Sequence, residues 1–181
     1  MEKPVLMIHE VNNFLFDSKK LENYTLTFDD GLYSQFYYYD SIKQIKTKKI
    51  FFISTNIICS GKQSLDFPTC QKAHEKSFNG NNEDYMTLDQ IIFLMNEDDV
   101  SIGGHGHFHK NLNQFKNLNE KINHLKKDTE LMLEWFEKNL KFKPNKFCFP
   151  YNDDLNGLYK LFLEKYGFEE FYGKERLSIQ F

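Results

Sequence analysis

The chain has 181 residues, 40% of them hydrophobic, so it is long enough to form one domain with its own core over residues 1–181. Its formal net charge of −3 excludes the strong excess of Lys and Arg that a nucleic-acid-binding surface needs. No apolar run approaches the length of a membrane span, and no signal peptide precedes the first apolar run. We therefore expect a cytoplasmic protein with no nucleic-acid partner and no membrane span.

The pattern of short apolar runs and longer amphipathic segments predicts alternating strands and helices. The predicted strands are 5–8, 24–28, 49–53, 100–103, 146–149 and, more weakly, 168–171 and 177–180. The predicted helices are 34–45, 87–95, 118–140 and 155–166. A capping box of Thr87 and Gln90 marks the start of the second helix. Such alternation is typical of a parallel sheet, either open or closed into a barrel.

Residues 60–84 form a long polar connection between predicted elements. A connection of this length is unusual in a compact domain and is often a functional insertion. We interpret this one as a disordered surface loop, and His74 within it as a surface or helix-face residue.

The three cysteines, Cys59, Cys70 and Cys148, lie far apart in the sequence. An odd number of cysteines without a secretion signal favours free thiols in a reducing compartment. None forms a Cys-x-x-Cys pair, which argues against a zinc site made of thiolates. Cys148 lies in an apolar run, so we expect it to be an inert buried thiol.

Polar residues follow four of the predicted strands directly. They are His9, Asp29 with Asp30, residues 105–109, and Pro150 with Tyr151. In parallel α/β folds the active site is built at the C-terminal ends of the strands. We therefore expect these four segments to meet at one edge of the sheet.

Each of these segments also has a simpler interpretation. Asp29-Asp30-Gly31 is, taken alone, more often a turn with a helix cap than a site. A lone histidine such as His9 at the end of a strand is more often structural than catalytic.

Three histidines within residues 105–109 are half of the six in the chain, which is unusual for a solvated loop. Imidazole and carboxylate side chains are common ligands of divalent metals. His105 could pair with His109, four residues later, or with His107 on the same side of an extended strand.

Three segments resemble motifs of the polysaccharide deacetylases of the NodB-homology type (carbohydrate esterase family 4). Residues 27–31, Thr-Phe-Asp-Asp-Gly, resemble the first motif, and residues 102–112 resemble the second. Residues 147–151, Phe-Cys-Phe-Pro-Tyr, resemble the third, which is usually Arg-x-Pro-Tyr. Similar runs at 51–55 and 167–168 extend the resemblance over nearly the whole chain.

The resemblance implies an α/β fold, a distorted (β/α) barrel with about seven parallel strands. It implies one divalent metal ion, often zinc, on Asp30, His105 and His109, with Asp29 as the general base. The backbone N–H of Tyr151 would help to hold the oxyanion, and the substrate would carry an N-acetyl group on an amino sugar. Co²⁺, Ni²⁺, Fe²⁺ and Mn²⁺ also suit these ligands.

We also expect substrate contacts from Pro150, Tyr151 and His107.

The chain departs from the family pattern at three points. Gly106 replaces a Ser or Thr, which removes a hydrogen bond near the metal. Cys148 stands where the family often has an Arg, so we expect Asp29 to lack its usual tether. No Leu-x-His element occurs near the C-terminus, so the usual general acid has no counterpart. His9 or His107 would have to donate the proton instead.

These features predict a metal-dependent N-deacetylase of an amino sugar or glycan precursor, with a role in the synthesis of a surface polysaccharide such as lipopolysaccharide or capsule. The main alternative is a catalytically silent module of the same fold that binds metal and carbohydrate. A hydrolase of another amide or of a formyl group is the second. The aromatic content of 17% exceeds what the core needs, so some rings are expected to line a sugar groove or the interface of a homo-oligomer.

Overall fold

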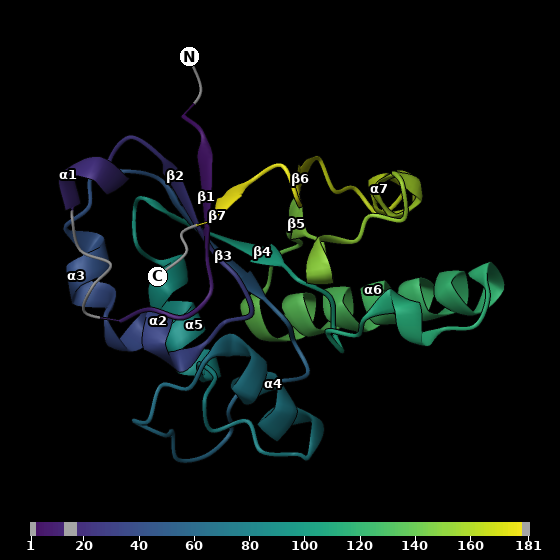
Figure 1. Ribbon diagram of the computed structural model, residues 1–181, viewed down its shortest axis with the longest axis horizontal. Coiled ribbons are helices and arrows are strands. Elements are labelled where there is room, and N and C mark those ends of the chain that lie inside the picture. The colour runs from purple at the N-terminus through teal and green to yellow at the C-terminus, as the bar shows by residue number, and fades with distance from the viewer. Residues whose placement is uncertain (1–2, 13–17, 179–181) are drawn as a thin grey trace.

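The computed structural model describes residues 3–12 and 18–178 and contains one sheet of seven parallel strands (Figure 1). The strands lie in the order β6-β5-β4-β3-β2-β1-β7. Their bounds are β1 Val5–Ile8, β2 Thr25–Phe28, β3 Lys49–Ile53, β4 Val100–Gly104, β5 Lys146–Cys148, β6 Glu170–Tyr172 and β7 Leu177–Ser178. Within the described residues the edge strands β6 and β7 do not pair with each other. The predicted α/β fold, a distorted seven-stranded barrel, is confirmed and is open on one side.

Helices pack around this sheet. The α-helices of the described residues are α1 Ser18–Leu21, α2 Tyr33–Tyr37, α3 Tyr39–Lys43, α4 Cys70–Phe78, α5 Leu88–Met95, α6 Leu118–Leu140 and α7 Leu158–Glu164. In Figure 1, α1 and α3 lie to one side of the strands, α6 and α7 to the other, and α4 lies beneath their lower ends. None of these helices is both long and apolar enough to span a bilayer.

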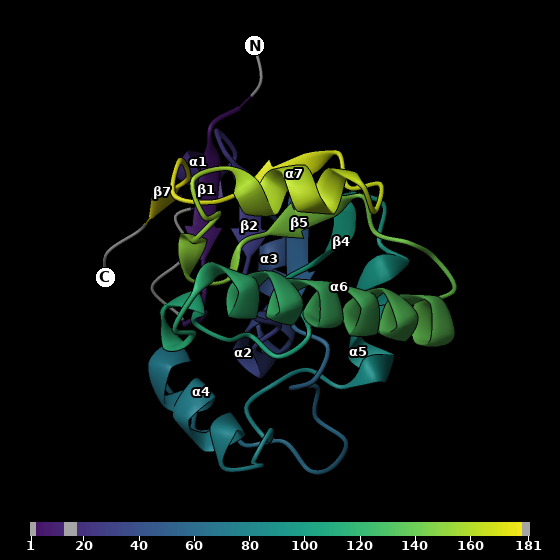
Figure 2. The same ribbon diagram turned by 90° about the vertical axis from the view of Figure 1, so that its right-hand side faces the viewer.

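The core lies between β3 and the helices that cover it. All five residues of β3 are buried, as expected for a central strand of a parallel sheet. The long helix α6 passes in front of the strands in Figure 2, with α7 beside it. It buries Leu125, Met132, Phe136 and Leu140, whose spacing places them on one helical face.

Two predicted helices differ from the structure. The segment 34–45 is interrupted at Tyr38, where the backbone (φ −93°, ψ 13°) separates α2 from α3. The helix predicted from residue 155 begins only at Leu158, because Leu155, Asn156 and Gly157 all adopt left-handed backbone conformations that an α-helix cannot contain.

The interpretation of residues 60–84 as a disordered loop was wrong. The segment contains α4, in which Ala73 and His74 are buried. It also pairs with the rest of the fold, because the Asp84 carbonyl accepts a hydrogen bond from the Tyr33 N–H (2.7 Å) and Tyr85 forms a bridge with Leu32. The segment is polar in composition, but it contains a short helix. The buried face of this helix includes a polar side chain, His74.

The close packing of β4 against its neighbours can be tested at Gly103. A Cβ there would lie 2.6 Å from the Phe52 ring and 3.0 Å from the Lys146 carbonyl oxygen. We expect Gly103→Ala to lower the free energy of unfolding by about 1–3 kcal/mol, measured by urea denaturation. Gly61→Ala is the matched control, since nothing lies within 4 Å of the added Cβ. Equal urea midpoints for the two variants would contradict this account of the packing.

Candidate active site

A cavity of about 500 Å³ lies at the C-terminal ends of the strands. Four predicted segments contribute to it, since His9 follows β1, the Asp29–Asp30 pair follows β2, His105 and His109 follow β4, and Tyr151 follows β5. The segment 60–84 adds a further wall through α4. The full lining is His9, Asp29, Asp30, Cys70, Gln71, His74, Glu75, Phe78, His105, His109, Phe149, Tyr151 and Asn152.

Local backbone geometry separates the two adjacent carboxylates. The Asp29 N–H donates to the Ile8 carbonyl (2.9 Å), which continues the β1–β2 pairing by one residue. Asp30 then turns into the left-handed region (φ 71°). The buried amide of Gln35, on α2, donates to the carbonyls of both His9 (2.7 Å) and Asp29 (2.6 Å). The two strand ends are thereby tied together, and each carboxylate has its own surroundings.

The Asp30 carboxylate is buried among imidazoles. Its Oδ1 lies 2.9 Å from Nε2 of His109 and 3.1 Å from Nε2 of His105. All three side chains are almost fully buried. The structure thus brings His109 rather than His107 to Asp30, which favours the spacing of His105 with His109.

These three residues fit a divalent cation. The Nδ1 of His105 is 2.8 Å from the Cys148 carbonyl oxygen, which can only accept, so Nδ1 carries the proton. Burial opposes protonation of His105, but the nearby Cys148 and Asp30 hold its pKa well above its usual value, so without an ion Nε2 carries a proton toward the Asp30 oxygen. A divalent ion can take the place of that proton, and a hydrogen bond from the second ring nitrogen to a carbonyl is typical of a metal-binding histidine.

Electrostatics support the same arrangement. Burial opposes ionisation of Asp30, but His109 and the other nearby imidazoles hold the pKa of this carboxyl well below its usual value. Burial lowers the pKa of His109 to about 4, against the attraction of Asp30. A carboxylate and a neutral imidazole at neutral pH are the protonation states that metal ligation requires.

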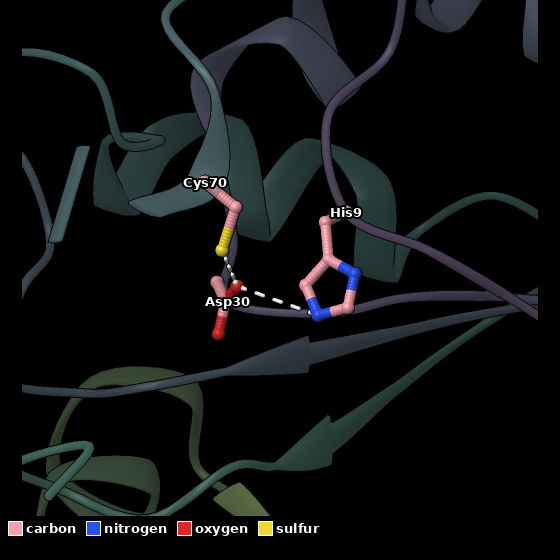
Figure 3. Close-up of side chains that lie close together, drawn as sticks. All are labelled: His9, Asp30 and Cys70. Atoms are coloured by element: carbon pink, nitrogen blue, oxygen red, sulfur yellow. Dashed lines mark hydrogen bonds and ion pairs between the residues drawn. The ribbon is translucent and has the colours of Figure 1, made fainter. Parts of the chain in front are cut away.

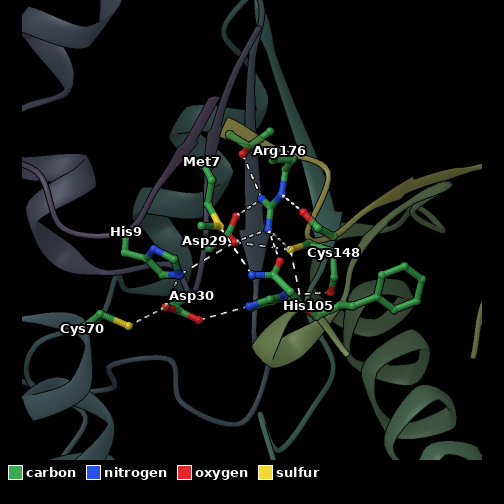
Figure 4. A network of polar contacts seen from close by, with 12 residues as sticks. Met7, His9, Asp29, Asp30, Cys70, His105, Cys148 and Arg176 are labelled. Carbon is green, nitrogen blue, oxygen red and sulfur yellow. Dashed lines mark hydrogen bonds and ion pairs between the residues drawn. The ribbon is translucent and has the colours of Figure 1, made fainter. Parts of the chain in front are cut away.

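The expectation that Asp29 lacks a tether was wrong, because Arg176 holds it. Nη1 of Arg176 donates to Oδ1 of Asp29 and Nη2 donates to Oδ2, both at 2.8 Å (Figure 4). The guanidinium also contacts Sγ of Cys148 (3.1 Å), Oγ1 of Thr27 (2.9 Å) and Oδ1 of Asn152 (3.0 Å). Cys148 is small enough to leave room for a guanidinium that enters from another part of the chain.

This ion pair sets the charge state of Asp29. Burial raises the pKa of its carboxyl, but the paired Arg176 outweighs burial and the net shift is downward. No motif marks Arg176, which precedes the short strand β7. One signal was available in the sequence, since Arg176 is the only arginine among 23 basic residues. A lysine at this point could not form the bidentate pair.

His74 and Cys70, on α4, are functional-site residues that the sequence reasoning missed. His74 is buried rather than on the surface, its ring is stacked on that of His109 (4.1 Å between centroids), and its Nδ1 is 2.9 Å from the Tyr85 hydroxyl. Cys70 begins α4, and its Sγ donates to Oδ2 of Asp30 (3.0 Å; Figure 3). Burial, with the nearby Asp30 carboxylate, raises the pKa of the Cys70 thiol.

The remaining predicted site residues divide into two groups. His9 and Tyr151 line the cavity: Nε2 of His9 lies 3.9 Å from Oδ2 of Asp29, and the Tyr151 ring lies 5.0 Å from the ring of His109. His107 turns away, and its Nδ1 is 2.7 Å from Oγ1 of Thr55. Pro150 is buried and does not line the cavity.

The glycine that replaces the family's Ser or Thr has a structural reason. Gly106 has φ 76°, and a Cβ there would lie 2.7 Å from Oδ2 of Asp128. The Asp128 carboxylate accepts hydrogen bonds from the backbone N–H groups of His107 (2.9 Å) and Phe108 (2.7 Å). The histidine loop is therefore held from α6 by a carboxylate that requires glycine at position 106.

Comparisons with known proteins show the family and the fold. The family model described as "Polysaccharide deacetylase" matches residues 18–171. The fold is similar to that of IcaB from Ammonifex degensii, with a TM-score of 0.68 and 14% identity over 99% of this chain and 92% of that one. It is also similar to a de-N-acetylase from Aggregatibacter actinomycetemcomitans, with a TM-score of 0.65 and 13% identity over 97% and 93% of the two chains.

A third similar structure is the Streptococcus pyogenes deacetylase PplD in complex with acetate, with a TM-score of 0.64 and 16% identity over 90% of this chain and 80% of that one. No curated protein matches the chain in sequence. At these identities the structural likeness shows the fold alone.

Zinc binding tests the ligand set. We expect His109→Ala to lose one equivalent of zinc, because only Asp30 and His105 remain of the three proposed ligands. The measurement is a competition titration with a chelator, followed by metal analysis of the desalted protein. His124→Ala is the control, since that imidazole lies on α6 outside the cavity. Equal zinc content in the two variants would contradict the assignment.

The Asp29–Arg176 pair can be tested through stability. Removal of one partner of a buried ion pair costs about 3–5 kcal/mol, so Arg176→Met should lower the free energy of unfolding by that amount. The double variant Asp29→Asn/Arg176→Met should lose less than the sum of the two single changes, because it leaves no unpaired charge. Urea denaturation of all four proteins measures the coupling, and strictly additive losses would show that the two residues are independent.

Proposed function

The chain belongs to the polysaccharide deacetylase family, and we propose that it is a metal-dependent hydrolase that removes an N-acetyl group from an amino sugar or glycan precursor. The observation that carries this proposal is the pair of adjacent carboxylates in one cavity, each with a different partner. Asp30 faces imidazoles, as a metal ligand should, and Asp29 is held by a guanidinium, as a positioned base should be.

The proposed ligands of the divalent ion are Asp30, His105 and His109. They provide one carboxylate and two imidazoles, a set that suits zinc and also Co²⁺, Ni²⁺, Fe²⁺ or Mn²⁺. When bound, the ion polarises the amide carbonyl and makes a water molecule more acidic.

Asp29 is the proposed general base. Its low pKa keeps the carboxylate ionised at neutral pH and able to accept a proton from the attacking water. The bidentate contact with Arg176 fixes the plane of the carboxylate, so that neither oxygen can rotate toward the ligands of Asp30. Arg176 is therefore a positioning residue that acts through Asp29.

His9 is the proposed general acid. Its Nε2 lies 3.9 Å from Oδ2 of Asp29, and about a third of its side chain is exposed at the cavity. A proton donor for the leaving amine must reach both the reacting group and the bulk solvent from which it is recharged, and this partial exposure suits that task. His107 is the weaker candidate, because its ring faces Thr55.

Two exposed aromatic side chains support a sugar substrate. Phe78, at the end of α4, is 57% exposed, and Tyr151 is 46% exposed, and both line the cavity. Exposed rings beside a polar centre offer apolar faces to the C–H groups of a pyranose. The cavity volume of about 500 Å³ lies within the usual range for small-molecule sites.

Acetate release from N-acetylated chito-oligosaccharides tests the proposal, with N-formylated sugars as a second substrate set. Asp29→Asn should abolish turnover but retain the metal. His9→Ala should lower kcat about 10²- to 10⁴-fold, the usual contribution of a general acid. His107→Ala is the matched control and should retain most of the activity. Metal binding with no release from any substrate would instead favour a silent carbohydrate-binding module, and equal rates for His9→Ala and wild type would exclude His9 as the acid.

A further inference from the structure

Asp30 has more metal-ligating neighbours than one catalytic ion uses. Its Oδ1 faces His105 and His109, which with Asp30 complete a set of three protein ligands. Its Oδ2 faces a different group. The distances from this oxygen are 3.0 Å to Sγ of Cys70, 3.4 Å to Nε2 of His74 and 4.0 Å to Nε2 of His9. His74 also groups with Asp30 and His109, whereas His9 and Cys70 group with Asp30 and with neither His105 nor His109.

The second group comes from three separate elements. Figure 3 shows His9, from the segment after β1, and Cys70, from the start of α4, converging on Asp30. One ligand atom from each of these residues lies within 4.8 Å of the other two. A single ion can bind donor atoms that lie this close together. These residues are therefore arranged as expected for a cation site separate from the first.

We propose that His9, Asp30 and Cys70 form a second cation site, and that the Asp30 carboxylate bridges it to the first. Oδ1 would serve the ion on His105 and His109, and Oδ2 the ion on His9 and Cys70. A bridging carboxylate is the usual way in which hydrolases hold two metals close together.

The donor set defines the class of cation. Thiolate and imidazole ligands select zinc, cobalt or iron over magnesium and calcium, which prefer oxygen. On binding, the Cys70 S–H bond breaks, its proton goes to solvent, and the sulfur lone pair forms the bond to the ion. The thiolate and the bridging carboxylate then offset the charge of the second ion.

The surroundings hold these ligands in place in the absence of an ion. The N–H of Cys70 donates to Oε2 of Glu10 (3.3 Å), which ties the start of α4 to the segment after β1. One turn later on α4, Nδ1 of His74 is anchored by the Tyr85 hydroxyl. The Cys70 thiol therefore stays at Asp30 without support from a metal.

The second site shares His9 with the proposed catalytic mechanism. This part of the inference therefore rests on the proposed function. Nε2 of His9 cannot bind an ion and donate a proton at the same time. The second ion therefore inhibits acetate release, whereas the first supports it. This inhibition should disappear in Cys70→Ser, which keeps His9 and the first set of ligands.

The test is a titration of the metal-free protein with Co²⁺, followed by absorption spectroscopy. We expect two equivalents to bind, and the second to bring the near-ultraviolet charge-transfer band of a cobalt–thiolate bond. Cys70→Ser should bind one equivalent without this band, and His9→Ala should bind the second equivalent more weakly. Cys59→Ser is the matched control, because it removes a buried thiol that does not line the cavity, and it should keep both equivalents and the band.

Several outcomes would overturn the proposal. A wild-type protein that binds a single equivalent, lost in His109→Ala, would refute the second site and leave the proposed hydrolase intact. A thiolate band that survives in Cys70→Ser but disappears in Cys148→Ser would identify Cys148 as the sulfur ligand and refute the proposed site. No cobalt binding at all would refute both the second site and the metal-dependent mechanism.

Discussion

Two carboxylates that are adjacent in the chain and both buried impose the main constraint on this fold. Asp29 and Asp30 are each about 1% exposed, and a buried charge without a partner costs several kcal/mol. The left-handed turn at Asp30 directs the two groups into separate surroundings. Three distant parts of the chain then converge on them: the segment before β7 supplies Arg176 to Asp29, while the histidine loop after β4 and the helix α4 supply the imidazoles and the thiol that surround Asp30.

Much of this arrangement could be predicted from the sequence. The strands read as short apolar runs because they are buried on both faces, and parallel order places their C-terminal ends together. Asp29, Asp30, His105 and His109 could therefore be assigned to one edge of the sheet from residue order alone. The 23-residue helix α6 could also be predicted, since its buried apolar residues repeat at helical spacing from Leu125 to Leu140.

The parts that escaped prediction share a physical cause. Arg176 acts through long-range contacts, and such contacts leave no periodicity in the sequence. The helix α4 turns His74 and Ala73 inward and keeps polar side chains outside, so its composition resembles that of a loop. The left-handed residues 155–157 include Leu155, which carries no turn signal, and the Asn156-Gly157 pair, a turn signal that the predicted helix start overlooked.

The position of Arg176 has a consequence for the way the site is maintained. It lies 147 residues from Asp29 in the chain, and the neighbouring strand β7 is two residues long, exposed, and paired with β1 at only Leu6 and Met7. Contacts of this kind form late in folding and open first in the native state. Fraying of this edge would release the guanidinium while the cluster around Asp30 stays folded, so the orientation of the base can be lost in local fluctuations that leave the rest of the molecule intact.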